Sequence, residues 1–145
     1  MKRRYSPVAL VTVAIAALVL AGSAGAFQGE PDGYNGIPWG SPLKGLESME
    51  RVGTQKDAPD ISLYRRAGDD LSFGRARLTG IEYGFSAGRL TAVTLKVDSL
   101  LHYLFLKEEA FIRFGKGKEM DPRAEMFIWE GDRTTMRLIS AFEMS

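Results

Sequence analysis

The sequence predicts an α+β protein, with an antiparallel sheet of about five strands, two helices packed on one face of the sheet, and a signal peptide before it. Three observations lead to this prediction. An uncharged apolar segment lies near the N-terminus, short alternating runs fill the middle of the chain, and apolar residues recur at helical spacing before and after those runs. The chain has 145 residues, which suits one ordinary domain.

The first 26 residues have the three parts of a secretory signal peptide. A basic start is followed by an uncharged apolar run over residues 8–21, and Ala24 and Ala26 then stand in the A-x-A arrangement. Signal peptidase recognises this arrangement because its pocket admits only small side chains. We expect cleavage after Ala26 and a periplasmic mature chain with no membrane span. The alternatives are an uncleaved inner-membrane anchor and secretion beyond the envelope.

The charge balance changes when the signal peptide is removed. The whole chain has 19 Lys and Arg against 18 Asp and Glu, and three of the basic residues lie in the signal. The mature chain therefore has a net charge of about −2, which offers no electrostatic reason to bind nucleic acid. The sequence has no cysteine, so it predicts no disulfide, no thiolate metal site and no attached lipid.

The mature chain is expected to begin with a flexible lead-in and to continue as one domain. Residues 27–36 are rich in Gly, Pro, Asp and Asn, which favours a flexible segment before a single α+β domain over residues 37–145. Ser41 and Pro42 indicate the start of a first helix, with apolar residues at helical spacing after them and Gly53 just past its end.

Four alternating runs and one clear helix follow. The predicted strands of the middle part are Ile61–Arg66, Leu71–Phe73, Leu78–Phe85 and Leu90–Val97. Asp98 and Ser99 cap a second helix over Leu100–Phe114, which ends at Gly115. Its predicted apolar stripe is Leu100, Tyr103, Leu104, Phe111 and Phe114. A last hairpin joins Glu125–Glu130 to Thr134–Phe142.

One motif matches a catalytic pattern. Gly84 to Gly88 reads GFSAG, the G-x-S-x-G pattern of serine hydrolases, and Ser86 is followed by Asp98 and His102 in triad order. That motif works on a turn from a strand into a helix, whereas strongly β-forming residues follow here. We therefore expect Ser86 to lie in an ordinary hairpin turn, and no catalytic residue is assigned. A small serine hydrolase remains the alternative function.

Metal and cofactor sites are not expected. His102 is the only histidine, and it is predicted on the side of the second helix away from the apolar stripe. The paired acids Asp69 and Asp70, and Glu108 and Glu109, lack the spacing of a calcium loop and are expected to be solvated.

The last hairpin carries the sequence's candidate for a partner-binding face. Phe127 and Trp129 alternate with Met126 and Ile128 along one strand, so both faces of that strand are apolar. With helices on only one face of the sheet, one of these pairs meets either solvent or a partner. The alternative is that the lead-in, with Tyr34 and Trp39, folds over the second face.

Several motifs together resemble a family of small exported bacterial proteins of uncharacterised function. The motifs are GIPWG at residues 36–40, IEYGF at 81–85, GRL at 88–90, FG at 114–115 and WEGD at 129–132. The resemblance implies a periplasmic α+β domain and brings no activity or site residue with it. The order of elements is also similar, more loosely, to small β-lactamase-inhibitor-like and outer-membrane-assembly lipoprotein modules, although the lipid-bearing cysteine is missing here.

These observations favour a non-catalytic binding or interaction module of the bacterial envelope. Its partner would be another envelope protein or a small ligand, and neither is named by the residues. The remaining alternative is a structural or stress-related protein of the envelope.

Overall fold

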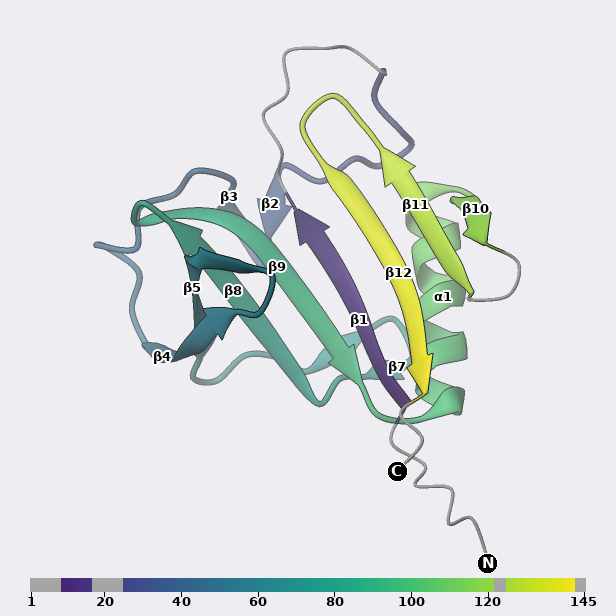
Figure 1. Cartoon of the computed structure of the whole chain (residues 1–145), viewed down its shortest axis with the longest axis horizontal. Helices are drawn as coiled ribbons and strands as arrows, with labels where there is room; N and C mark the ends of the chain where they lie inside the picture. Colours follow the sequence, from purple (N-terminus) through teal and green to yellow (C-terminus); the bar gives the residue numbers. More distant parts are fainter. Residues whose placement is uncertain (1–8, 17–24, 122–124, 143–145) are drawn as a thin grey trace, which may run out of the picture.

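A computed structural model describes residues 9–16, 25–121 and 125–142, and these residues form a mainly β protein with one helix (Figure 1). The main sheet has eight strands in the order β10-β11-β12-β1-β9-β8-β5-β4, with every neighbouring pair antiparallel. The strands are β1 (Ala9–Ala16), β4 (Met49–Gln55), β5 (Ala58–Arg66), β8 (Gly80–Ser86), β9 (Arg89–Val97), β10 (Lys118–Asp121), β11 (Met126–Glu130) and β12 (Thr135–Phe142). Two small hairpins pair β2 (Gly33–Tyr34) with β3 (Ile37–Pro38), and β6 (Ser72–Phe73) with β7 (Ala76–Arg77).

The predicted fold class is wrong, because the sheet is larger than five strands and only one of the two expected helices forms among the described residues. Residues 41–48 are irregular, and β4 takes up the residues after them. The expected helix fails because its backbone groups bond elsewhere: the Leu43 amide donates to Gly88 and the Ser41 carbonyl accepts from Leu90. Gly45 adopts φ 153°, which no α-helix contains.

Most local predictions outside that segment are confirmed. The expected strands at 61–66, 78–85 and 90–97 correspond to β5, β8 and β9, and the last hairpin corresponds to β11 and β12. The helix α1 spans Leu100–Phe114 as predicted. The Ser99 side chain caps it by accepting a hydrogen bond from the His102 amide at 3.2 Å, and Gly115 ends it with φ 78°.

The buried side of α1 differs from the predicted stripe. Leu100 and Leu104 are about half exposed, at 54% and 48%, whereas Leu106 is fully buried. The helix buries Tyr103, Leu106, Ala110 and Phe114. The buried face differs from the predicted one because leucines occur on both sides of the helix, and helical spacing alone does not decide which of the two apolar faces is buried.

One face of the sheet carries the hydrophobic core, and α1 covers it beside β11 and β12 (Figure 1). Alternate residues of β9, namely Val93, Leu95 and Val97, are completely buried. Met136 and Leu138 of β12 are at most 1% exposed. The intervening Thr94 and Lys96 are partly exposed on the other face. This alternation is the period-two pattern of a sheet with one face on the core.

The strand β1 lies in the middle of the sheet, between β12 and β9. It pairs with β12 from Ala9↔Phe142 to Ala16↔Thr135, and with β9 from Val11↔Val97 to Ala16↔Ala92. Its residues belong to the segment that the sequence assigns to the signal peptide. A chain cleaved after Ala26 therefore lacks this strand.

Among the residues that the structure describes, no helix is both long enough and apolar enough to cross a membrane.

Candidate functional site

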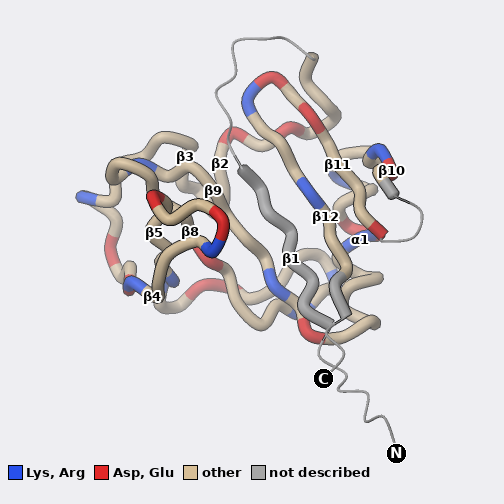
Figure 2. Tube along the Cα trace, in the orientation of Figure 1, with Lys and Arg blue, Asp and Glu red and all other residues tan. Residues whose placement is uncertain are grey.

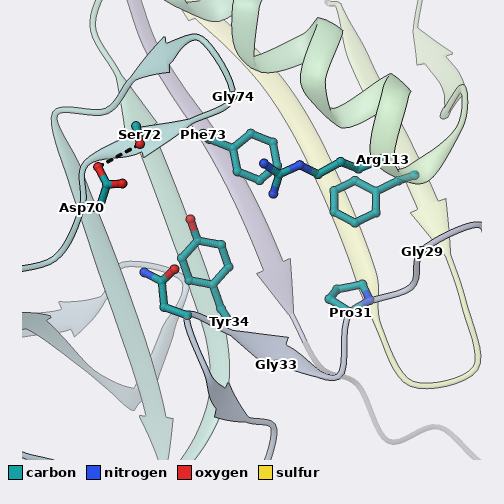
Figure 3. Close-up of a pocket in the computed structure, with 11 residues that line it drawn as sticks. Gly29, Pro31, Gly33, Tyr34, Asp70, Ser72, Phe73, Gly74 and Arg113 are labelled. Atoms are coloured by element: carbon teal, nitrogen blue, oxygen red, sulfur yellow. Dashed lines mark hydrogen bonds between the residues drawn. The ribbon is translucent and has the colours of Figure 1, made fainter.

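A cavity of about 590 Å³ lies where the lead-in, the β6–β7 hairpin and the C-terminal end of α1 meet. The lead-in supplies five of its lining residues, the hairpin region four and the helix two. They are Gly29, Pro31, Gly33, Tyr34, Asn35, Asp70, Ser72, Phe73, Gly74, Arg113 and Phe114. Figure 3 shows these residues around the cavity. We refer to this cavity as the Arg113 pocket.

The wall of the pocket combines a cation with aromatic rings. The Arg113 guanidinium lies over the Phe73 ring, with 4.2 Å from Cζ to the ring centroid, and Phe73 is stacked on Phe114 at a centroid distance of 6.5 Å. The Arg113 Nε donates to Glu109 Oε1 at 2.7 Å, one helical turn back. This contact uses Nε, so the two terminal nitrogens of the guanidinium keep their N–H donors beside the Phe73 ring.

Tyr34 brings a hydroxyl donor to the same space. Its burial raises the pKa of the phenol to about 12; the nearby Arg113 charge lowers this pKa, and Asp69 and Asp70 raise it. The phenol therefore remains protonated over the ordinary pH range. In Figure 3 the Tyr34 hydroxyl points toward the strand that carries Ser72, whose hydroxyl donates to Asp70 Oδ1 at 2.8 Å.

A second tyrosine fixes the base of the lead-in beside the pocket. The Tyr83 hydroxyl donates to Asp69 Oδ2 at 2.6 Å and accepts from Asn35 Nδ2 at 3.1 Å. Burial and the hydrogen bond to Asp69 both raise the pKa of Tyr83. The Tyr34 and Tyr83 rings lie 6.4 Å apart. This network holds β2 and the Asp69–Asp70 turn in fixed positions relative to β8.

The lead-in also contacts the rest of the molecule over most of its length. Phe27 packs edge-on against Phe114 at 6.0 Å, and Gln28 donates to the Ile112 carbonyl at 3.0 Å, near the C-terminal end of α1. The Glu30 carboxylate accepts hydrogen bonds from the backbone amides of residues 132, 133 and 134. The lead-in thus forms one side of the pocket and connects it to the β11–β12 turn.

Ser86 of the G-x-S-x-G match is not brought together with Asp98 and His102. Ser86 ends β8 and pairs with Arg89 at the hairpin turn, whereas Asp98 follows the far end of β9. The nine residues of β9 separate them by roughly 30 Å at about 3.4 Å per residue. His102 lies near Asp98 in the chain, and its Nδ1 accepts a hydrogen bond from the Arg77 amide at 3.0 Å.

The paired acids form separate contacts. Asp69 and Asp70 bond Tyr83 and Ser72, while Glu108 and Glu109 bond Arg75 and Arg113. Across residues 9–16, 25–121 and 125–142, no group of three His, Cys, Asp or Glu residues is arranged to hold a metal ion.

Phe127 and Trp129 lie on the side of β11 that faces α1. Each is only 4% exposed, and Phe111 of the helix packs edge-on against both rings. The Trp129 Nε1 donates to the Gly115 carbonyl at 2.9 Å. The helix α1 therefore covers these two rings, and a partner would contact them only after α1 moved away. The other face of the strand presents Met126 and Ile128, which are partly exposed.

The two alanines of the predicted cleavage site fall at the edge of the described chain. Ala24 lies outside the described residues, and Ala26 is exposed.

The pocket residues Tyr34, Phe73 and Arg113 were not predicted as a site. Glu109 and Arg113 form an ion pair one helical turn apart. No spacing rule joins Tyr34 to Arg113, because 78 residues separate them. The available signal was the combination of tyrosine, glycine and proline in the lead-in with a single arginine near the end of a helix.

Comparison with known proteins finds no matching family model, curated protein or solved structure. Within the part of the chain that the structure describes, the fold and the site define a mainly β protein with one helix and a ligand-sized pocket between its lead-in and that helix.

Proposed function

We propose that this chain is a non-catalytic binding module of the bacterial envelope, exported by its signal peptide, and that it binds a small ligand in the Arg113 pocket. The observation that carries the proposal is the pocket itself. Its volume of about 590 Å³ is within the range of ligand sites, roughly 300–1,000 Å³. Its lining combines the apolar rings of Phe73 and Phe114 with polar side chains, namely Tyr34, Asn35, Asp70, Ser72 and Arg113.

The residues of the pocket favour a small organic anion. Among the described residues that line the cavity, Arg113 is the one cation, and its planar guanidinium suits a carboxylate or phosphate group. The buried rings of Phe73 and Phe114 support the guanidinium from behind and exclude water from that side of it. Tyr34 remains protonated and supplies a further donor for the same ligand.

The export part of the proposal is supported by the sequence of the first 26 residues. The basic start, the uncharged run over residues 8–21 and the pair Ala24 and Ala26 occur in the order that a signal peptide needs. Fractionation of a Gram-negative host that expresses the whole gene, followed by intact-mass measurement, tests it. The expected result is a periplasmic chain with the mass of residues 27–145, and a full-length mass would contradict it.

Ligand binding is tested with a matched pair of probes, phenylacetate and its neutral analogue phenylacetamide. Phenylacetate is expected to raise the thermal unfolding midpoint in a saturable way, and phenylacetamide to have a much smaller effect. Arg113→Gln should abolish the difference between the two probes. The matched control is Arg51→Gln, because Arg51 is exposed and outside the pocket lining.

Two results would contradict the ligand proposal. The first is an equal response to both probes in the parent chain. The second is an unchanged response in Arg113→Gln. A protein that binds neither probe and is required only for the mechanical integrity of the envelope would support the structural alternative instead.

A further inference from the structure

The strand β1 occupies a slot whose two walls are β9 and β12. On the β12 side it pairs over eight residues, and on the β9 side over six. Both flanking strands run antiparallel to β1, so they run parallel to each other. Without β1, the backbone N–H and C=O groups that face the slot from both walls have no partner strand, and such groups are strongly selected to be paired.

The slot does not close simply by moving its walls together. Direct pairing of β9 with β12 requires a shift of about 4.8 Å, one strand spacing. The helix α1 opposes this shift because it is tied to both halves of the molecule. Phe111 packs against Phe127 and Trp129 on the β12 side, while His102 bonds the Arg77 amide on the other side.

The lead-in holds the two walls at the opposite end. Glu30 accepts three amide hydrogen bonds from the turn between β11 and β12. A few residues later, the Gly40 amide donates to the Leu90 carbonyl of β9 at 2.9 Å. Both of these contacts involve residues after Ala26, so cleavage leaves them in place.

We propose that the mature chain uses this slot to bind an extended segment of a partner polypeptide, which adds a strand between β9 and β12. The inference rests on the proposed export and cleavage, since only cleavage removes β1. Binding by strand addition derives its affinity from main-chain hydrogen bonds and its specificity from alternate side chains. Here both edges of the added strand find a partner.

The side chains of β9 and β12 that border the slot determine which residues an occupant can have. On the core face, an incoming strand meets Leu95 and Leu138 at one register position and Val93 and Met136 at another, all buried. Its residues at these positions must be apolar. On the other face it meets Lys96 and Arg137, and Figure 2 shows Lys and Arg on both walls. Lys96 is already paired with Glu82 at 2.8 Å, so Arg137 is the wall cation that disfavours a basic residue beside it. The occupant is therefore a segment of about eight residues, apolar at alternate positions and without Lys or Arg next to Arg137.

A second mature copy cannot supply the strand that the structure seats in the slot. Cleavage after Ala26 removes residues 9–16 from every copy alike. A second copy therefore cannot insert the same segment, and we take the occupant to be a different polypeptide.

The experiment compares the processed chain with a chain that keeps its first 26 residues. The whole gene is expressed in a Gram-negative host, and the processed form is identified by intact mass. The retained form carries Ala24→Tyr and Ala26→Tyr, which place large side chains where signal peptidase needs small ones. It is refolded from denaturant without membrane, so that residues 9–16 can enter the sheet. The probe is a synthetic peptide of residues 9–16 with two glutamates added at each end, and the control peptide carries Val13→Pro, which cannot join a ladder.

Two measurements are expected to agree. The probe should bind the processed chain saturably in fluorescence anisotropy, at least about tenfold more tightly than the proline peptide, and should not bind the retained chain. Those backbone amides of 92–97 and 135–140 that face the slot should exchange at least about tenfold faster in the processed chain, and the probe should restore their protection.

The alternatives are separated by the same data. A processed chain in which these amides are protected without the probe, or which dimerises through them, would overturn the slot as a partner site. A processed chain that stays unfolded even with the probe would overturn it too. A parent chain that is found uncleaved would instead overturn the processing on which the inference rests, and intact mass distinguishes that case from the others.

Discussion

The Glu30 carboxylate accepts a hydrogen bond from the Thr134 amide at 2.8 Å, across 104 residues of the chain. The same oxygen accepts from the Arg133 amide at 2.7 Å, and the second oxygen accepts from the Asp132 amide at 3.2 Å. Three consecutive amides thus surround one carboxylate, an arrangement that suits negative charge. This contact ties the segment that lines the Arg113 pocket to the turn between β11 and β12.

Replacement of Glu30 by alanine is expected to lower the free energy of unfolding by about 2 kcal/mol, because three amides lose a charged acceptor. Urea denaturation of the parent and Glu30→Ala chains measures this difference. Glu47→Ala is the matched control, since Glu47 is exposed. An equal effect of both substitutions would show that the Glu30 contact contributes nothing specific.

Gly117 is expected to tolerate no side chain. A Cβ at this position would lie 2.8 Å from the Trp129 indole ring, closer than real contacts allow. Gly117→Ala should therefore destabilise the fold by about 1–3 kcal/mol through displacement of the ring. It should also shift the tryptophan emission, whereas Lys116→Ala, at an exposed neighbour, should change neither. Unaltered emission in Gly117→Ala would contradict the packing described here.

The raised pKa of Tyr34 predicts a loss of stability at high pH. The unfolded chain releases this proton near pH 10, whereas the folded chain holds it to about pH 12. The folded state therefore binds more protons between these values, and stability falls as the pH rises through this window. Below pH 10 the contribution is complete.

Urea denaturation at pH 9 and at pH 11.5 measures the slope, and ultraviolet titration reports ionisation of the phenols. Tyr34→Phe should reduce the loss of stability between the two pH values, while the raised pKa of Tyr83 preserves part of it. A parent chain whose stability rises over this interval would refute the prediction.

His102 is expected to contribute through its acceptor nitrogen. His102→Leu removes the acceptor for the Arg77 amide and should cost about 1 kcal/mol. His102→Asn offers an oxygen near the same position and should recover part of that loss. Denaturant midpoints of the three chains test the order, and an asparagine variant less stable than the leucine variant would contradict it.

Local patterns predicted much of the strand and helix content. The alternation of Val93, Leu95 and Val97 with more polar neighbours indicates a half-buried strand, and the structure buries these three residues. Ser99 and Gly115 mark the two ends of α1 as expected. The helix predicted after Ser41 is wrong. Its leucines occur at helical spacing, but an irregular segment packs Leu43 and Leu46 against the core equally well.

Local sequence patterns did not predict the candidate site. Phe127 and Trp129 stood out in the sequence because they make a strand apolar on both faces, and the structure places them under α1. The pocket residues Tyr34, Phe73 and Arg113 come from three separate segments. Each of them has an ordinary local context, so nothing in their spacing indicates that they meet.

By itself the sequence determined the features that depend on neighbouring residues: the hairpin from β8 to β9, the capped helix, the lack of disulfides and the signal-like character of its first 26 residues. Side-chain periodicity and capping act within a few residues, so they can be read along the chain. Tertiary structure alone decided that the residues after Ser41 are irregular, that Glu30 meets Thr134, and that residues 9–16 form the strand between β9 and β12. These outcomes depend on backbone groups and surfaces supplied by distant segments, and a one-dimensional pattern does not specify which distant segment supplies them.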